Sequence, residues 1–308
     1  EASGLPFASQ NPGVMHACGH DMHMASVLGV IKVMKKLRDH WKGQLLFIFQ
    51  PGEEKIPGGA KLMLEEGIFN HHRPDMILAQ HVLPEMEAGC VGFKSGQYMA
   101  SSDELYLTVR GKGGHGALPE KVHDPVLMAS HILISLQQEI NRLAPSGIPT
   151  VISFGKVVAD GAVNVIPDHV DLEGTFRTMD ENWRTRAHTL IKQIAGGIAS
   201  GMGGSVDVNI ARGYPVLYNN PEMTRRATGA ATKLLGQDNV KAMDVRMTAE
   251  DFAIFSHKYP SLLYRFGVRK PGEEQVCALH TNKFNAWEPA LKTGISVMST
   301  LAFEFLQD

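Results

Sequence analysis

Apolar runs separated by polar, glycine- and proline-containing turns recur along most of the chain, a pattern typical of an α/β protein. Residues 21–38 are apolar nearly all round as far as residue 34, which predicts a helix buried on most sides. Continuous apolar runs predict central parallel strands at 44–50, 76–80 and 261–267. Further helices are predicted from Pro221, with Asn220 as its cap, and from Glu288 onward.

The stretch from residue 101 to residue 213 has a different character. Alternating apolar and polar positions predict strands at 104–110, 151–158, 169–177 and 205–210. Two helices are predicted to follow the caps Asp124 and Asp180. The order β-α-β-β-α-β is typical of a ferredoxin-like α+β unit. We therefore predict an α/β domain made of residues 1–100 and 214–308, interrupted by an inserted domain of residues 101–213.

Composition narrows the class of protein. A chain of 308 residues with 44% hydrophobic and 20% charged residues is long enough for two hydrophobic cores. A formal net charge of -2 gives no electrostatic reason to expect nucleic acid or an anionic membrane as a partner. No apolar run is long enough to span a bilayer. Three widely spaced cysteines (Cys18, Cys90 and Cys277) favour a reducing compartment, and hence the cytoplasm, without a disulfide framework.

Residues 15–25, MHACGHDMHMA, place several metal-binding side chains directly before the first predicted helix. A lone cysteine beside a turn is more often a small buried apolar residue. Here a single flexible glycine separates Cys18 from His20, so both can face one Zn²⁺ or a similar ion. His16 and His23 are also candidates. Four side chains so close together cannot all be ligands, so we expect these two to support the site or to pack.

The predicted strands deliver further ligand-type residues to their carboxyl ends, where α/β sheets place their chemistry. The first strand runs into Glu53 and Glu54, the second runs into His81, and the third leads into a loop that carries His280. Adjacent acids are usually solvated surface charge. Directly after a buried strand, however, their desolvation is costly unless cations compensate. Because neighbouring side chains point in different directions, one acid can bind a metal while the other acts as a general base on water.

Two motifs need a different interpretation. Pro-Gly-Glu-Glu occurs again in a polar loop, where we expect Glu273 and Glu274 to be exposed. GKGGHG, residues 111–116, matches the dinucleotide-binding pattern G-x-G-x-x-G, but Ala-Leu-Pro follows where that pattern requires a helix. We reject nucleotide binding and predict that these glycines bring the backbone close to a ligand, with His115 projecting from the loop.

Six motifs together resemble the M20 metallopeptidase family: CGHDMH, FQPGEE, the QH at His81, GKGGHGALP, MTAEDFA and ALHTNKFNA. The resemblance covers essentially the whole chain. Its best match is the amidohydrolase branch, which includes N-acyl-amino-acid, hippurate and auxin-conjugate hydrolases. It implies a zinc-peptidase-like α/β catalytic domain with an inserted dimerisation or lid domain. Family members begin with further strands and a helix, including an Asp-bearing strand near the metals, and we expect that segment to be missing ahead of this chain.

Carried across residue by residue, the resemblance implies two divalent metal ions, Mn²⁺ or Zn²⁺, held by Cys18, His20, Glu54, His81 and His280. Cys18 stands where other branches carry a metal-bridging Asp, which implies a bridging thiolate. Glu53 is the implied general base. His115 resembles a histidine that reaches a neighbouring active site and stabilises the oxyanion. Asn164 and Arg177 resemble residues near the substrate carboxylate, although a turn Asn and a surface Arg would explain them equally well.

The leading hypothesis is hydrolysis of the amide bond of an N-acyl amino acid by water that Glu53 deprotonates, in a homodimer formed through the inserted domain. A dipeptidase or carboxypeptidase with the same residues is the alternative among enzymes. A catalytically inactive scaffold that retains the fold is the alternative from another class. The intact pair of Glu53 and Glu54 beside all five candidate ligands argues against the scaffold.

Overall fold

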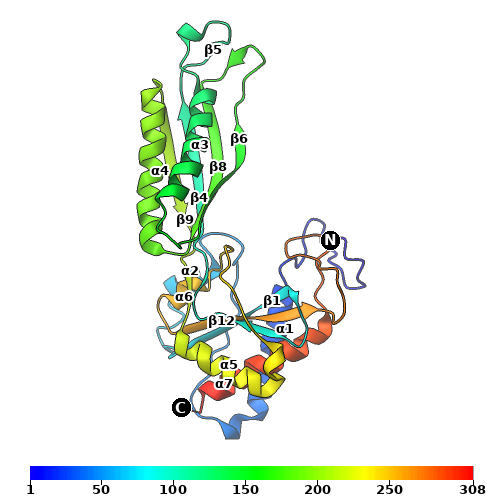
Figure 1. Ribbon diagram of the computed structural model, residues 1–308. Helices are drawn as coiled ribbons and strands as arrows, with labels where there is room; N and C mark the ends of the chain where they lie inside the picture. The colour runs from blue at the N-terminus through cyan, green and yellow to red at the C-terminus, as the bar shows by residue number, and fades with distance from the viewer. Residues whose placement is uncertain (308) are drawn as a thin grey trace.

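The computed structural model describes residues 1–307, and Figure 1 shows two lobes joined at a narrow junction. The lower lobe holds both ends of the described chain and a four-stranded sheet in the order β1-β12-β2-β11. The upper lobe is elongated and holds a second four-stranded sheet in the order β6-β8-β4-β9. The mixed α/β fold expected from the sequence is confirmed.

The lower sheet is built around the parallel pair β1 (Ile77–Glu87) and β12 (Ser261–Arg269). β12 also pairs antiparallel with β2 (Val91–Phe93), which pairs parallel with β11 (Val240–Ala242). Two of the three apolar runs in the sequence therefore form parallel strands, as predicted. β12 is central as expected, whereas β1 is an edge strand and the prediction of a central position for it is wrong.

β1 is longer than the sequence predicts, and this changes the place of His81. Val82 and Leu83 continue the buried apolar run beyond the histidine, so His81 lies inside the strand and not after its end. Its backbone is in register with Arg265 of β12. A histidine with only 7% of its surface exposed therefore interrupts the apolar run without ending the strand.

The third predicted strand, residues 44–50, is not a strand in the structure. β1 is the edge strand of its sheet, and within residues 1–307 nothing pairs with 44–50 in a β-ladder. Leu45 and Phe47 pack against the lower core, whereas Leu46 and Phe49 are 49% and 46% exposed. An apolar run favours burial, but a strand also needs a neighbour that accepts and donates its backbone hydrogen bonds.

The three longest helices of the lower lobe are α1 (His20–Lys36), α5 (Pro221–Leu235) and α7 (Leu291–Phe305), the last preceded by the short helix η4 (Glu288–Ala290). Gly29 allows α1 to approach α7, since a Cβ there would lie 2.4 Å from Ile295. The prediction that the first helix is buried on most sides is wrong, because Met24 and Leu28 are 44% and 53% exposed. Among residues 1–307, no helix combines the length and apolar character needed to cross a membrane.

Smaller elements line the junction side of the lower lobe. They are α2 (Gly59–Glu65), α6 (Ala253–Ser256) and the antiparallel pair β3 (Gly96–Met99) and β10 (Leu217–Asn219). They enclose a separate apolar cluster that includes Phe69, Tyr98 and Phe255.

Single 3₁₀ turns lie at η1 (Arg38–His40), η2 (Pro119–Lys121) and η3 (Gln237–Asn239).

The upper lobe has the chain order β-α-β-β-α-β, and every neighbouring pair in its sheet is antiparallel. Its elements are β4 (Asp103–Arg110), α3 (Pro125–Leu143), β6 (Thr150–Val158), β8 (His169–Thr178), α4 (Glu181–Gly201) and β9 (Ser205–Arg212). The side chains of Asp124 and Asp180 accept backbone N–H groups at the starts of α3 and α4, as expected of helix caps. The short pair β5 (Gly114–His115) and β7 (Val165–Ile166) forms the far tip of this lobe.

Candidate metal centre and active site

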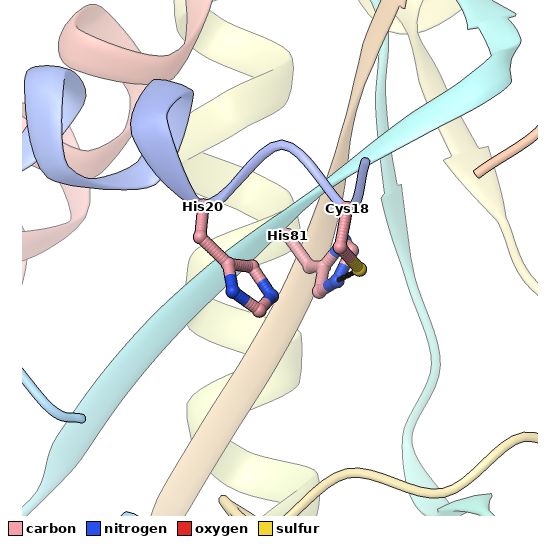
Figure 2. Close-up of side chains that lie close together, drawn as sticks. All are labelled: Cys18, His20 and His81. Carbon is pink, nitrogen blue, oxygen red and sulfur yellow. Dashed lines mark hydrogen bonds between the residues drawn. The ribbon is translucent and has the colours of Figure 1, made fainter. Parts of the chain in front are cut away.

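Cys18, His20 and His81 come together where the start of α1 meets β1 (Figure 2). The Sγ atom of Cys18 lies 3.5 Å from Nε2 of His81 and 3.3 Å from Nε2 of His280. His280 belongs to the loop after β12, and its backbone N–H donates to the carbonyl of Ala17. One backbone hydrogen bond therefore holds that loop beside the cysteine.

Gly19 makes this approach possible. It adopts the left-handed conformation with φ of 77°, which glycine adopts at little cost. A Cβ atom at this position would lie 2.6 Å from Cγ2 of Val82 in β1. A side chain here would therefore push the turn that carries Cys18 and His20 away from His81.

The two carboxylates face the same cluster from the loop before α2. Oε1 of Glu54 lies 3.5 Å from Nε2 of His280 and 3.9 Å from Nε2 of His20. Oε2 of Glu53 lies 3.8 Å from Nε2 of His20. All five predicted ligands, together with Glu53, thus converge on one site although they come from separate parts of the chain.

The donor atoms form overlapping groups that fit metal ions. Within each group they lie within 4.8 Å of one another: Cys18 with His20 and His81, Cys18 with Glu54 and His280, and His20 with Glu53 and Glu54. Cys18, His20 and Glu54 each belong to two of these groups, so the three groups are linked through shared donors. Thiolate, imidazole and carboxylate are donors that Zn²⁺ accepts together.

Burial sets the protonation of these donors. It lowers the pKa of His81 well below its usual range, so the ring is neutral and can present a nitrogen lone pair. Nδ1 of His81 lies 2.8 Å from the carbonyl oxygen of Val82, which orients Nε2 toward Cys18. Burial, reinforced by Glu54 and Glu53, raises the pKa of the Cys18 thiol, so binding of a cation there must release a proton.

His23 and His16 do not join the donor groups. Nε2 of His23 accepts the backbone N–H of Val82, and its ring packs 4.6 Å from that of His81. It therefore supports the strand that carries His81, as expected of a residue that packs beside the site. His16 is exposed and contributes to none of the donor groups found among residues 1–307.

Sequence reasoning missed the buried charges behind the carboxylates. Glu250 and Asp251, from the MTAEDFA motif, are 8% and 0% exposed, and Asp251 accepts from the side chain of Gln50 and the backbone of Ala60. Arg265 is 3% exposed and donates to the hydroxyl of Tyr98. The sequence did contain a signal for the two acids, because they stand directly before the apolar run Phe-Ala-Ile-Phe. Adjacent acids next to an apolar run are the same pattern that singled out Glu53 and Glu54 after residues 44–50.

Three of the predicted site residues lie away from the cluster of donor groups in their own chain. His115 and Asn164 are exposed at the far tip of the upper lobe, where the backbone N–H of Gly116 donates to the carbonyl of Asn164 (Figure 1). Arg177 is half-buried on β8, and its guanidinium donates to the carbonyl of Met247 in the lower lobe. The structure therefore does not bring Asn164 and Arg177 together. Glu273 and Glu274 are exposed, as expected.

Comparison with known proteins shows the family of this chain. The family model for peptidase family M20/M25/M40 matches residues 1–304. The chain belongs to this family. The resemblance drawn from the sequence motifs is thereby confirmed.

Relatives of this M20 chain include two named deacetylases. It is 37% identical to the N-acetyldiaminopimelate deacetylase of Bacillus velezensis over 97% of this chain and 77% of that protein. It is 35% identical to the N-acetylcysteine deacetylase of Bacillus subtilis over 100% of this chain and 78% of that protein. A crystal structure from Bacillus subtilis, described as a dinuclear metal-binding M20 peptidase, superimposes with a TM-score of 0.81 at 32% identity and covers 100% of this chain and 78% of that one.

Proposed function

We propose that this protein is a metal-dependent amidohydrolase that cleaves the amide bond of N-acyl amino acids. The observation that carries the proposal is the convergence of five ligand-type side chains and the half-buried carboxylate of Glu53 near the start of α1. Similarity to deacetylases of N-acetyldiaminopimelate and N-acetylcysteine supports an N-acyl amino acid as the substrate class.

In this proposal two divalent cations, Zn²⁺ or Mn²⁺, are held by Cys18, His20, Glu54, His81 and His280. The thiolate of Cys18 would be shared, since its Sγ is near both His81 and His280. When bound, such ions polarise the amide carbonyl and make the attacking water more acidic. One M20 relative of known structure is a dinuclear metal-binding peptidase, which supports two ions.

Glu53 would act as the general base. Its carboxylate takes a proton from the attacking water and returns that proton to the leaving amine. Burial, reinforced by Glu250 and Glu54, raises the pKa of Glu53 to about 9, which favours the protonated form needed between these two steps. The positive charge of bound cations acts in the opposite direction and favours the ionised form needed at the start.

Residues 101–213 would form the dimerisation or lid domain of a homodimer. Apolar side chains are exposed on the outer surface of α3 and on the edge strand β6: Val126, Leu127, Ile134, Val157 and Val158. Burying them against a second copy would remove apolar area from water.

The partner subunit would then complete the active site. A tip that lies away from its own metal cluster can serve the cluster of a second copy in a symmetric dimer. His115 of the partner subunit would stabilise the oxyanion there. Asn164 of the partner subunit and the chain's own Arg177 would bind the substrate carboxylate.

A substrate panel tests the proposal. Purified protein loaded with Mn²⁺ or Zn²⁺ is incubated with N-acetyl amino acids and, separately, with dipeptides, and the release of free amino acid is measured. We expect hydrolysis of N-acetyl amino acids that a chelator abolishes. Faster cleavage of dipeptides, or undiminished hydrolysis after chelation, would reject the assignment.

A further inference from the structure

A single tyrosine connects the junction between the lobes to the loop that carries Glu53. Tyr214 lies in the segment that leads from β9 back into the lower lobe, and only 7% of its surface is exposed. Its hydroxyl donates a hydrogen bond of 2.6 Å to the backbone carbonyl oxygen of Glu53. Its ring also packs against Gly58 in the same loop, where a Cβ atom would lie 2.8 Å from Cε1 of the tyrosine.

The backbone around Tyr214 is fixed to the upper lobe. Its carbonyl accepts the N–H of Ser102, and the N–H of Gly213 donates to the carbonyl of Ser102. Both segments that join the lobes are thus hydrogen-bonded to each other at this point.

Arg184 of α4 holds the two joining segments together. Its guanidinium is 1% exposed and donates to the carbonyl oxygens of Ser102 and Gly213. It also pairs with the fully buried carboxylate of Asp103, with 3.0 Å between Nε and Oδ2. A buried guanidinium with several acceptors is held in one geometry, so Tyr214 extends from a rigid frame.

Two backbone hydrogen bonds lie within the loop that carries Glu53, from the N–H of Lys55 to the carbonyl of Gly52 and from the N–H of Gly58 to the carbonyl of Lys55. Asp251 holds both ends of this loop, through the side chain of Gln50 and the backbone N–H of Ala60. Between those ends the hydroxyl of Tyr214 supplies a restraint at Glu53 itself. A catalytic carboxylate must be held within a fraction of an ångström of its working position.

We propose that Tyr214 is a positioning residue that couples the orientation of the upper lobe to the position of the Glu53 carboxylate. A rotation of the lobes about residues 102 and 213 would move the tyrosine hydroxyl and, with it, the backbone of Glu53. The base is therefore aligned in one orientation of the lobes. This inference rests on the proposed role of Glu53 in amide hydrolysis.

Tyr214→Phe tests the inference because it removes the hydroxyl and retains the ring. We expect kcat for an N-acetyl amino acid to fall by about tenfold to a hundredfold, with KM and metal content unchanged. Tyr218→Phe is the matched control, since Tyr218 is 45% exposed and four residues further along the chain, and it should leave kcat unchanged. A kcat for Tyr214→Phe within twofold of the wild-type value, or a parallel loss of bound metal, would overturn the inference.

A second measurement does not depend on activity. Hydrogen–deuterium exchange of the amides in residues 52–58 should become faster in Tyr214→Phe, while exchange in β12 stays unchanged. Unchanged exchange in residues 52–58 would reject the restraint even if the protein hydrolyses N-acyl amino acids. A wild-type protein without hydrolytic activity would instead reject the proposed function. The exchange measurement would still show whether the hydroxyl of Tyr214 restrains the loop.

Discussion

At the scale of single residues, Glu53 and Glu54 show how two identical neighbours acquire different chemistry. The side chain of Glu53 is 21% exposed, whereas that of Glu54 is 50% exposed and faces both His20 and His280. Burial beside Glu250 raises the pKa of Glu53. The more buried acid is therefore suited to carry a proton, and the other is suited to bind a cation.

Substituting each acid by glutamine should separate these roles. We expect Glu53→Gln to retain bound metal and to lose kcat by several orders of magnitude, because the proton acceptor is removed and the ligands remain. Glu54→Gln should also weaken metal binding. Metal content and kcat measured on the same preparations give the answer, and a nearly normal kcat in Glu53→Gln would refute the assignment of the base.

At the scale of elements, the turn before α1 depends on Gly19. Gly19→Ala places a side chain at φ of 77° and against Val82, so we expect a stability loss of at least ~1–2 kcal/mol and weaker metal binding. Gly13→Ala is the matched control, because Gly13 has φ of 78° but nothing within 4 Å of the added Cβ. Denaturant unfolding would compare the stabilities of the two variants, and metal titration would compare their metal affinities. Equal effects in the two variants would mean that contact with β1 is unimportant.

Helices and strands with local sequence signals could be predicted from the sequence alone. The cap residues Asp124, Asp180 and Asn220 and the apolar runs of β1 and β12 are local signals, and they predicted the elements well. Residues 44–50 did not form a strand, because strand formation depends on a neighbour that no local pattern specifies. His81 was singled out correctly, but its place inside β1 follows from burial and not from its position in the sequence.

The candidate site was predictable where ligands followed recognisable motifs, and unpredictable where it depends on long-range packing. The hydrogen bond from Tyr214 to Glu53 joins residues far apart in the chain, and no spacing in the sequence indicates it. The buried charges of Glu250 and Arg265 likewise acquire their importance only from the fold.

At the scale of the whole molecule, His115 lies at the far tip of the upper lobe, whereas the candidate metal centre lies in the lower lobe of the same chain. We therefore predict that the histidine acts across a dimer. His115→Ala and Glu53→Gln chains should each be nearly inactive. In a mixed dimer both lesions would fall in one site and the other site would be intact, so activity should reappear.

His169→Ala provides the control for this experiment, since His169 is an exposed histidine of the same lobe and its loss should leave activity unchanged. Mixed dimers are isolated with two affinity tags and assayed on an N-acetyl amino acid. Verified mixed dimers that remain inactive would place the histidine contact within one chain and refute the shared site.

The central claim is that this M20 protein hydrolyses N-acyl amino acids with metal ions held by Cys18, His20, Glu54, His81 and His280. Titration of metal-free protein with Mn²⁺ or Zn²⁺, with hydrolysis of an N-acetyl amino acid followed at each step, tests it most directly. We predict no hydrolysis without metal and a rate that rises until about two ions are bound per chain, as expected of a two-metal site. Full activity in protein that retains no metal would contradict it.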